Sequence, residues 1–226
     1  MSTRPSKAIV AAFTAAVALV ASCRPETRFP DVDLRSSGVG IVAEGCALTA
    51  HLASGFVLDH PSHVVTVAHA IAGATSISVV DSAGVVHRAT VRAFDKDRDL
   101  AVLDVPGLHG SALHLGPSTV GPALILTWGR DAGVTSAEVN VSKRLTVTIE
   151  DIYLEEIIER RGIEVLGDVH SGDSGGPVVS STGDVIGIIY AQSRVRDRVG
   201  FATDSSELDA LLRTTANTPV ANGRCG

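Results

Sequence analysis

The sequence predicts an all-β fold of two six-stranded antiparallel β-barrels with a short C-terminal helix. Short runs rich in Val, Ile and Thr repeat along the chain from about residue 38, and turn residues separate them. These runs follow one another too closely for the helical crossovers that a parallel sheet needs. With 45% hydrophobic and 19% charged residues, the 226-residue chain has enough apolar surface to bury a core.

The first barrel is predicted from six runs, with turn residues at 59–61 and 82–84 between them. The runs cover residues 39–42, 55–58, 64–68, 77–80, 85–94 and 100–105. They assign residues 37–107 to an N-terminal barrel. The segment 108–122, rich in Gly, Pro, Ser and His, is expected to link the two barrels.

A second set of runs predicts a C-terminal barrel over residues 123–204. Its members cover residues 123–127, 135–141, 145–149, 163–166, 177–180, 185–191 and 199–203. Within this set, residues 153–161 place apolar side chains on one helical face and charged ones on the other, so we expect a surface helix there. Asp204 and Glu207 fit a capping box that opens a helix, so helix and tail are expected over residues 205–226.

The first 22 residues have the pattern of an export signal. Arg4 and Lys7 precede an uncharged stretch over residues 8–21, which is shorter than the roughly 20 residues that cross a bilayer as a helix. The stretch ends in LVASC at residues 19–23, which resembles the bacterial lipobox. We therefore expect a signal peptide over 1–22, a lipidated Cys23 that anchors the protein to a membrane, and a linker over 23–36. The alternative is ordinary secretion with an unmodified Cys23.

The cysteine count agrees with export. There are three cysteines, and an odd number in an exported chain leaves one to be explained. Lipidation would use Cys23, and Cys46 and Cys225 would then remain as a pair able to form a disulfide in an oxidising compartment. The alternative is that both remain free thiols.

The charge balance excludes one class of partner. Lys and Arg number 19 against 25 Asp and Glu, and the formal charge of -6 has the wrong sign for binding phosphate backbones. Nucleic acid is therefore not an expected partner. The histidines show no metal-ligand spacing, and no metal or other cofactor is expected.

The most specific stretch of the sequence is GDSGGP at residues 172–177, a glycine-rich turn directly before an apolar run. The turn presents the Ser174 hydroxyl, and the backbone N–H groups of Gly172 and Ser174 could stabilise the oxyanion of a tetrahedral intermediate. Upstream, the run 64–68 delivers His69 at its end, and Asp99 stands just ahead of the run 100–105. The three side-chain types of a nucleophile, a base and its orienting carboxylate thus occur in the order His, Asp, Ser.

These elements resemble the chymotrypsin-like (trypsin-like) serine proteases, in which the same residues occur in this order. The closest likeness is to the bacterial HtrA-type and MarP-type periplasmic protease domains, through residues 55–57, 66–69, 99–103, 151–153 and the GDSGGP turn. The resemblance covers nearly everything after residue 37. It implies a site between two barrels, with His69 as general base, Asp99 as its orienter and Ser174 as nucleophile, and it supports the Cys46–Cys225 pairing.

Substrate specificity is less well defined by the sequence. Asp168 lies six residues before Ser174, where trypsin holds the acid at the base of its specificity pocket, which would imply cleavage after Arg or Lys. The alternative is a solvated turn residue. The strand ending at Ser193 is expected to pair with the substrate backbone, and Gly200 is expected to form another pocket wall.

Trypsin also uses the carboxylate at the position of Asp173 to receive a new N-terminus after activation cleavage. The sequence Ile41-Val42 looks like such a terminus, but it lies too close to His69 for this role. We therefore expect no activating cleavage.

Together these features predict a serine endopeptidase of the bacterial cell envelope that acts on peptides or proteins through an acyl-enzyme. Two alternatives remain. One is a catalytically weak protein that uses the same fold as a binding module, and the other is an esterase.

Overall fold

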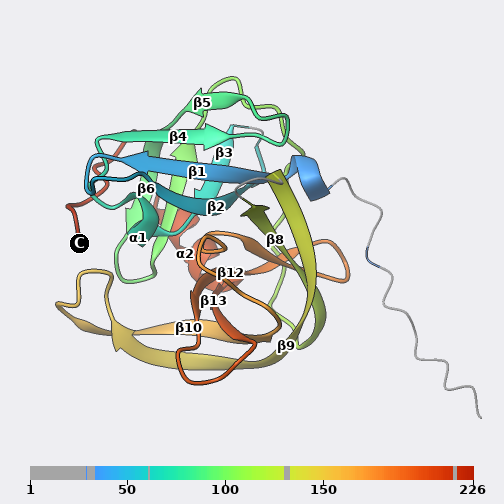
Figure 1. Ribbon diagram of the computed structural model, residues 1–226. Helices are drawn as coiled ribbons and strands as arrows, with labels where there is room; N and C mark the ends of the chain where they lie inside the picture. The colour runs from blue at the N-terminus through green and yellow to red at the C-terminus, as the bar shows by residue number, and fades with distance from the viewer. Residues whose placement is uncertain (1–28, 30–33, 61, 130–132, 216–217) are drawn as a thin grey trace, which may run out of the picture.

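The computed structural model describes residues 29, 34–60, 62–129, 133–215 and 218–226. It contains two antiparallel sheets that lie one above the other in Figure 1. A 3-10 helix, η1 (Leu34–Ser36), precedes the first sheet, and the helix α2 (Ser205–Thr214) follows the last strand. The predicted fold class is therefore confirmed in its two sheets and its short C-terminal helix.

The first sheet has seven strands rather than six, in the order β5-β4-β1-β2-β3-β7-β6. The extra strand arises because the predicted run 85–94 is broken at Ala89 into two strands that belong to opposite ends of the sheet. The bounds are β1 Gly38–Glu44, β2 His51–Val57, β3 His63–Thr66, β4 Ser76–Val80, β5 Val86–Arg88, β6 Thr90–Asp95 and β7 Leu100–Asp104. This sheet curls without closing, since no pairing joins β5 to β6 in the described part of the chain.

The second sheet closes into a six-stranded barrel in the order β10-β13-β12-β11-β8-β9. Its strands are β8 Gly121–Gly129, β9 Gly133–Glu150, β10 Ile157–Leu166, β11 Pro177–Ser180, β12 Val185–Gln192 and β13 Val199–Asp204. The predicted runs 135–141 and 145–149 form the single long strand β9, because the residues between them continue the pairing with β10.

The helix expected over residues 153–161 is wrong. The Asp151 carboxylate instead accepts hydrogen bonds from the N–H groups of Tyr153 and Glu155, which closes a turn, and the chain enters β10 at Ile157. From Ile157 to Arg161 the more exposed residues alternate with the less exposed ones, which is the period of a strand. Pairing with β9 therefore overrides the helical arrangement of apolar residues.

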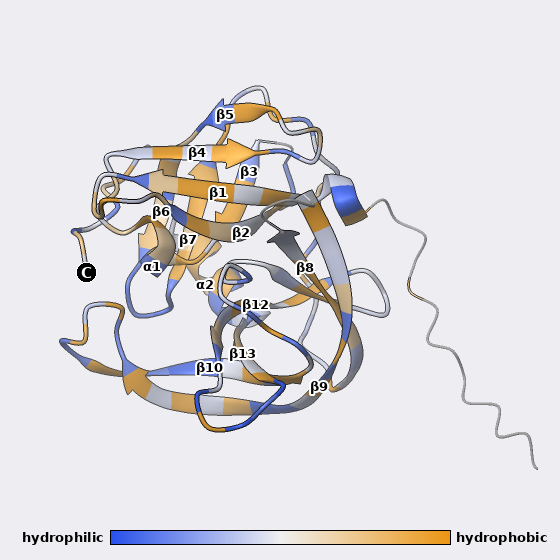
Figure 2. Cartoon of the chain, viewed as in Figure 1, coloured by the Kyte–Doolittle hydropathy of each residue, from blue (hydrophilic) through white to orange (hydrophobic). Residues whose placement is uncertain are grey.

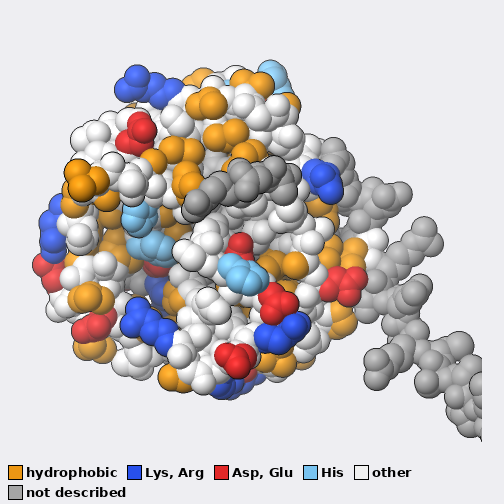
Figure 3. Space-filling model, viewed as in Figure 1, with side chains coloured by type: hydrophobic (Ala, Val, Ile, Leu, Met, Phe, Trp, Pro, Cys, Tyr) orange, Lys and Arg blue, Asp and Glu red, His pale blue; other side chains and the backbone are white. Residues whose placement is uncertain are grey.

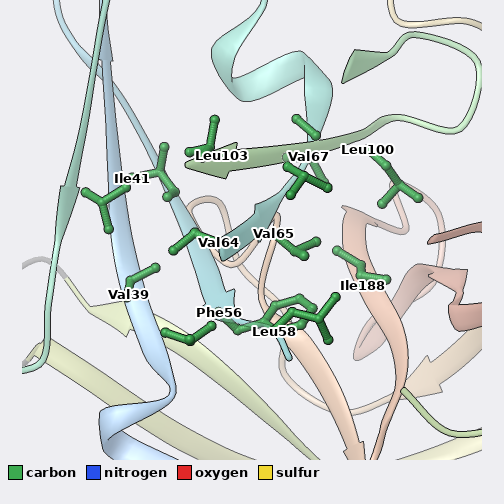
Figure 4. Packing of buried hydrophobic residues seen from close by; sticks show 14 of the residues in the cluster. Val39, Ile41, Phe56, Leu58, Val64, Val65, Val67, Leu100, Leu103 and Ile188 are labelled. Carbon is green, nitrogen blue, oxygen red and sulfur yellow. The ribbon is translucent and has the colours of Figure 1, made fainter. Parts of the chain in front are cut away.

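Two hydrophobic clusters fill the molecule. The larger lies inside the first sheet and extends across to the second, where Ile188 of β12 packs with residues such as Val65 and Leu100 (Figure 4). The smaller fills the closed barrel around Ile163 and Ile189. Hydrophobic residues accordingly concentrate in the strands in Figure 2. Because the larger cluster is shared, the two sheets are fixed against each other by apolar packing.

The C-terminal helix begins as the sequence predicts. Asp204 is the N-cap, and its side chain accepts a hydrogen bond from the N–H of Ser206. Glu207 does not complete the capping box. It is buried, and its carboxylate accepts hydrogen bonds from the side chains of Arg98 and Arg161.

After α2 the chain returns to the first sheet. The N–H of Gly73 donates to the carbonyl of Asn222, whose side-chain amide donates to the carbonyls of Ile71 and Ala74. A disulfide joins Cys46 to Cys225 across a sequence separation of 179 residues. The tail is thus tied to the helix α1 (Ala68–Ile71) and to the loop after β1 (Figure 1).

The predicted signal peptide over 1–22 and the predicted lipidation of Cys23 lie outside the described residues. Within the described residues, no helix has the length and apolar character needed to span a bilayer.

Candidate active site

His69 and Asp99 meet at the edge of the first sheet that faces the closed barrel. His69 lies in α1, directly after β3, and Asp99 immediately precedes β7, the neighbour of β3. The Asp99 carboxylate accepts two hydrogen bonds, from the His69 ring Nδ1 at 2.8 Å and from the His69 backbone N–H at 2.9 Å. The Asp99 side chain is 5% exposed and that of His69 is 35% exposed. The histidine therefore keeps its other ring nitrogen, Nε2, available to the cleft.

The ionisation of His69 reflects this pair. Burial by itself would lower the pKa of the imidazole, but the charge of Asp99 and its hydrogen bond to the ring outweigh burial. The pKa of His69 is raised as a result. A neutral imidazole whose Nδ1–H is fixed by a carboxylate presents Nε2 as a proton acceptor.

The loop that carries Asp99 is fastened to the closed barrel. Lys96 donates from its ammonium to the carboxylates of Asp97, Asp151 and Glu156 at 3.0, 2.7 and 2.9 Å. Among the described residues, these three carboxylates are the one group whose oxygens lie close enough together to hold a metal ion. The Lys96 ammonium bonds to all of them, so this cluster does not fit a metal ion.

Ser174 lies in the turn between β10 and β11, on the closed barrel. The two glycines that flank it have left-handed backbone conformations, with φ of 102° at Gly172 and 89° at Gly175. A Cβ at Gly175 would lie 2.1 Å from the carbonyl oxygen of Ser54, so only glycine fits there. The N–H groups of Gly172 and Ser174 donate to no acceptor within the described parts of the chain, whereas those of Asp173, Gly175 and Gly176 do. These two free N–H groups are the pair that the sequence predicts for an oxyanion hole.

The Ser174 hydroxyl donates to the carbonyl of Tyr190 at 3.4 Å. In the described residues no hydrogen bond joins it to His69, although both side chains line one cavity of about 330 Å³. Catalytic hydrogen bonds of this kind are often long without substrate and tighten when substrate binds.

Ser54 of β2 is a fully buried residue of the first sheet. It forms hydrogen bonds with the turn that carries Ser174 on the second sheet. Its hydroxyl donates to the Gly172 carbonyl at 2.8 Å and accepts from the Trp128 N–H at 2.8 Å. Its backbone N–H donates to the Ser174 carbonyl, also at 2.8 Å. The sequence analysis missed this residue. Ser54 directly precedes the predicted run 55–58, and no local pattern distinguishes it, because its partners lie far away in the chain.

The Asp173 carboxylate, in the position that receives a new N-terminus in trypsin, has a partner within its own turn. It accepts a hydrogen bond from the backbone N–H of His170 at 2.7 Å. Burial raises the pKa of Asp173 against the effects of His170 and of a hydrogen bond from Thr127. The expectation that no activating cleavage is needed stays a prediction.

Two cavities meet at His69, and the smaller of them also contains Ser174. The smaller, described above, is lined by Leu52, Trp128 and Gly172 in addition to the two catalytic candidates. The larger, of about 850 Å³, is lined by His69, Asp99, the hairpin between β9 and β10, and the end of β12. Figure 3 shows this face hollowed between the two sheets, with histidine side chains at the edge of the hollow. Two exposed apolar residues, Leu154 and Val195, stand on the rim of the larger cavity.

The predicted specificity residues are only partly brought to the site. Ser193 lines the larger cavity. Asp168 is instead 54% exposed and pairs with Arg198 at 3.2 Å, so its position fits the solvated turn residue better than the floor of a pocket. Gly200 is buried, and a Cβ there would lie 2.6 Å from the Val169 side chain, which occupies the space beside it.

An antiparallel two-sheet molecule with a His–Asp pair on one sheet and a serine in a glycine-rich turn on the other has the architecture of the chymotrypsin-like serine proteases. Comparison with family models matches residues 53–188 to the trypsin-like peptidase domain. The chain belongs to this family.

Similar proteins include the serine protease Rv3671c of Mycobacterium tuberculosis, which is 29% identical over 177 residues, 76% of this chain and 44% of that protein. The chloroplastic protease Do-like 1 of Arabidopsis thaliana is 31% identical over 174 residues, covering 71% of this chain and 39% of that protein. The chain thus spans less than half the length of these relatives. The crystal structure of the active form of the Rv3671c protease superposes with a TM-score of 0.78 at 26% identity, over 96% of this chain and 99% of that chain.

Proposed function

We propose that this chain is a serine endopeptidase that acts through an acyl-enzyme. The observation that carries the proposal is the 2.8 Å contact of His69 Nδ1 with Asp99, beside a glycine-rich turn that presents Ser174 to the same cavity. The Ser174 oxygen attacks the peptide carbonyl and His69 Nε2 takes its proton. His69 then gives the proton to the leaving amine, and water releases the acyl group by the reverse sequence. Asp99 orients and stabilises the imidazolium, and the N–H groups of Gly172 and Ser174 bind the oxyanion.

Labelling with a fluorophosphonate, together with digestion of a peptide library by residues 24–226, tests this proposal. We expect one label on Ser174, cleavage within peptides, and loss of turnover on the order of 10^6-fold in Ser174→Ala. An unlabelled, inactive wild-type protein would instead identify a binding module. Cleavage of esters without cleavage of peptides would identify an esterase.

We further propose that the protein acts in the cell envelope after export, anchored by a lipid on Cys23. The uncharged stretch that ends at Cys23 supports this location, as does a Cys46–Cys225 disulfide, which persists in oxidising compartments. Two acyl chains anchor a protein stably, whereas one does so only marginally. We expect Cys23→Ser to move the protein from the membrane fraction to the soluble fraction or to block its processing. Wild-type protein that is wholly soluble, with an unmodified N-terminus after Ser22, would favour simple secretion.

A further inference from the structure

One buried arginine in the larger cavity has no place in the proposed catalytic steps. Arg160 lies in the middle of β10, and only 6% of the residue is exposed. It lines the cavity of about 850 Å³ together with His69, Asp99 and Tyr190. The guanidinium is therefore next to the residues of the candidate site, whereas the helix predicted over 153–161 would have placed this side chain towards solvent.

Arg160 touches both halves of that site. Its guanidinium carbon lies 4.1 Å from the centre of the Tyr190 ring, and its Nη1 donates to the Asp97 carbonyl at 3.2 Å. Tyr190 is the residue whose carbonyl accepts the hydrogen bond of the Ser174 hydroxyl. Asp97 lies two residues before Asp99. One side chain thus links the loop of the His–Asp pair to the strand beside the nucleophile.

The stability of the fold does not explain this arrangement. In the described part of the chain Arg160 forms no ion pair, and its buried Nε has no acceptor. Lys96 and Arg98, in contrast, each bond to carboxylates. A buried cation without a counter-ion destabilises a folded protein, and apolar replacements of buried charged groups are often neutral or stabilising. The position of Arg160 is therefore better explained by the function of the site.

The charge of Arg160 also acts on His69. It lowers the pKa of the imidazole, against the raising effect of Asp99. The other charged groups that line the same cavity are Glu150, Asp151, Arg194 and Arg196, and His51 lines the smaller one. Asp99 and Arg160 are the charged groups whose effects on the pKa of His69 are resolved.

We propose that Arg160 is a positioning residue, which fixes the His69–Asp99 pair relative to Ser174 by joining the Asp97 carbonyl to the Tyr190 ring. The proposal rests on the serine peptidase function proposed above. Its chemistry is a planar cation stacked on an aromatic ring with a donor aimed at a backbone carbonyl, a combination suited to arginine. Substrate need not touch Arg160 for this role.

The test measures the second-order rate of fluorophosphonate labelling of Ser174 against pH, together with the melting temperature. The proteins compared are the wild type, Ser174→Ala, Arg160→Met, Arg160→Lys and, as a control, Arg213→Met. Arg213 pairs with Asp209 on the surface of α2. Labelling reports the activation of Ser174 without depending on the choice of peptide.

We expect Arg160→Met to label roughly a hundredfold more slowly, because small displacements in an active site have effects of this size. Its melting temperature should stay within a few degrees of the wild type or rise. Loss of the positive charge raises the pKa of His69, which must be neutral to accept a proton, so the acid limb of the labelling profile should move to higher pH. Arg160→Lys keeps the positive charge, so its acid limb should lie at the wild-type pH, but its labelling rate should be only partly recovered. Arg213→Met should match the wild type in both.

The proposal is overturned if folded Arg160→Met labels at the wild-type rate with an unshifted acid limb. It is also overturned if its only defect is a lower melting temperature. If Arg160→Met does not fold, Arg160→Lys decides: a wild-type rate and profile in the lysine variant excludes a need for the planar stack. If the wild-type protein is not labelled, the peptidase proposal itself fails and this inference fails with it.

Discussion

Asp99 has a backbone conformation that few residues other than glycine adopt, with φ of 54°. Aspartate and asparagine tolerate this left-handed region because their short polar side chains bond locally. Here the carboxylate accepts both the ring N–H and the backbone N–H of His69. The unusual conformation is thus coupled to the orientation of the histidine.

Asp99→Asn removes the negative charge of Asp99 with little change in the size of the side chain. Asparagine keeps the left-handed backbone but removes the negative charge and presents an amide to the His69 ring. We expect kcat to fall by about 10^4, as in other triads, with little change in melting temperature. The pKa of His69, measured by NMR, should also fall, because the charge that raises it is gone. Turnover within tenfold of the wild type would contradict the role of Asp99.

Ser54 offers a second test at this scale. In Ser54→Ala the Gly172 carbonyl and the Trp128 N–H lose a buried partner, which costs about 1–3 kcal/mol of unfolding free energy. We also expect the turn around Ser174 to shift, so that peptide turnover falls about tenfold to a hundredfold. Urea unfolding and steady-state kinetics measure the two effects. Ser76→Ala, in β4 of the same sheet, is the control, and equal effects in both variants would argue against a special role of Ser54.

The sequence singled out His69, Asp99 and Ser174 because each lies in a local pattern, namely a strand end, a strand start and a glycine-rich turn. Ser54 and Arg160 have no such pattern. Their partners are contributed by segments far away in the chain, so only the folded structure brings them together. Asp168 shows the reverse case, in which spacing from Ser174 predicted a pocket residue and the structure gives an exposed ion pair.

At the level of elements, the hairpin between β9 and β10 is joined to the loop before β7 through Lys96. The buried Asp151 carboxylate accepts a hydrogen bond from Lys96 and from two backbone N–H groups of its own turn. These bonds favour the charged form, and the pKa of Asp151 is lowered to about 2. The ionised carboxylate thus fastens one element to the other.

This link predicts a particular dependence of stability on pH. Because the pKa of Asp151 is lower in the folded state, its contribution is full above about pH 4, the pKa of the unfolded chain. It is lost as pH falls toward 2. We expect Asp151→Asn to be less stable than the wild type at neutral pH, with the difference shrinking between about pH 4 and pH 2 in urea unfolding.

Asp209→Asn is the control for this prediction, because Asp209 lies in an exposed ion pair on α2. Exposed pairs of this kind contribute little. A difference between Asp151→Asn and the wild type that stays constant from pH 7 to pH 2 would show that the carboxylate charge is not involved.

The same hairpin shows where reading elements from sequence fails. The apolar residues at 154, 157 and 158 fit a helical face, and the charged residues between them fit its opposite. A short segment satisfies two periods at once, and pairing with the long strand β9 decides in favour of a strand. Where one signal dominates, the prediction is correct: Asp204 is the N-cap of α2, as the sequence predicts.

On the scale of the whole molecule, the disulfide joins the start of the first sheet to the C-terminal tail. Closing so long a loop stabilises the fold by up to about 5 kcal/mol in the chain-entropy model. We expect the double variant Cys46→Ser, Cys225→Ser to unfold at lower urea concentration than the wild type. Mass analysis of a non-reducing digest should show the Cys46–Cys225 peptide. Two alkylatable thiols in the native wild-type protein would contradict this prediction.

The two-sheet architecture was accessible from the sequence because turn residues divide the strand runs into two sets with a Gly- and Pro-rich segment between them. The number of strands in the first sheet could not be predicted from the sequence. The break at Ala89 arises because the residues before it pair with β4 and the residues after it pair with β7. The shared core was also not accessible. Nothing in a strand pattern states that Ile188 packs into the other sheet.

The Cys46–Cys225 bond has a further consequence for the peptidase function proposed above. A peptidase at high concentration is also a substrate for its neighbours, and exposed loops are the segments most easily nicked. Any single cut between residues 46 and 225 leaves two fragments that the disulfide still holds as one covalent molecule. The shared apolar core keeps the fragments in register. A single nick in a surface loop would therefore not separate the sheet that carries His69 and Asp99 from the barrel that carries Ser174, so we expect self-digestion at one such loop to leave the candidate site assembled.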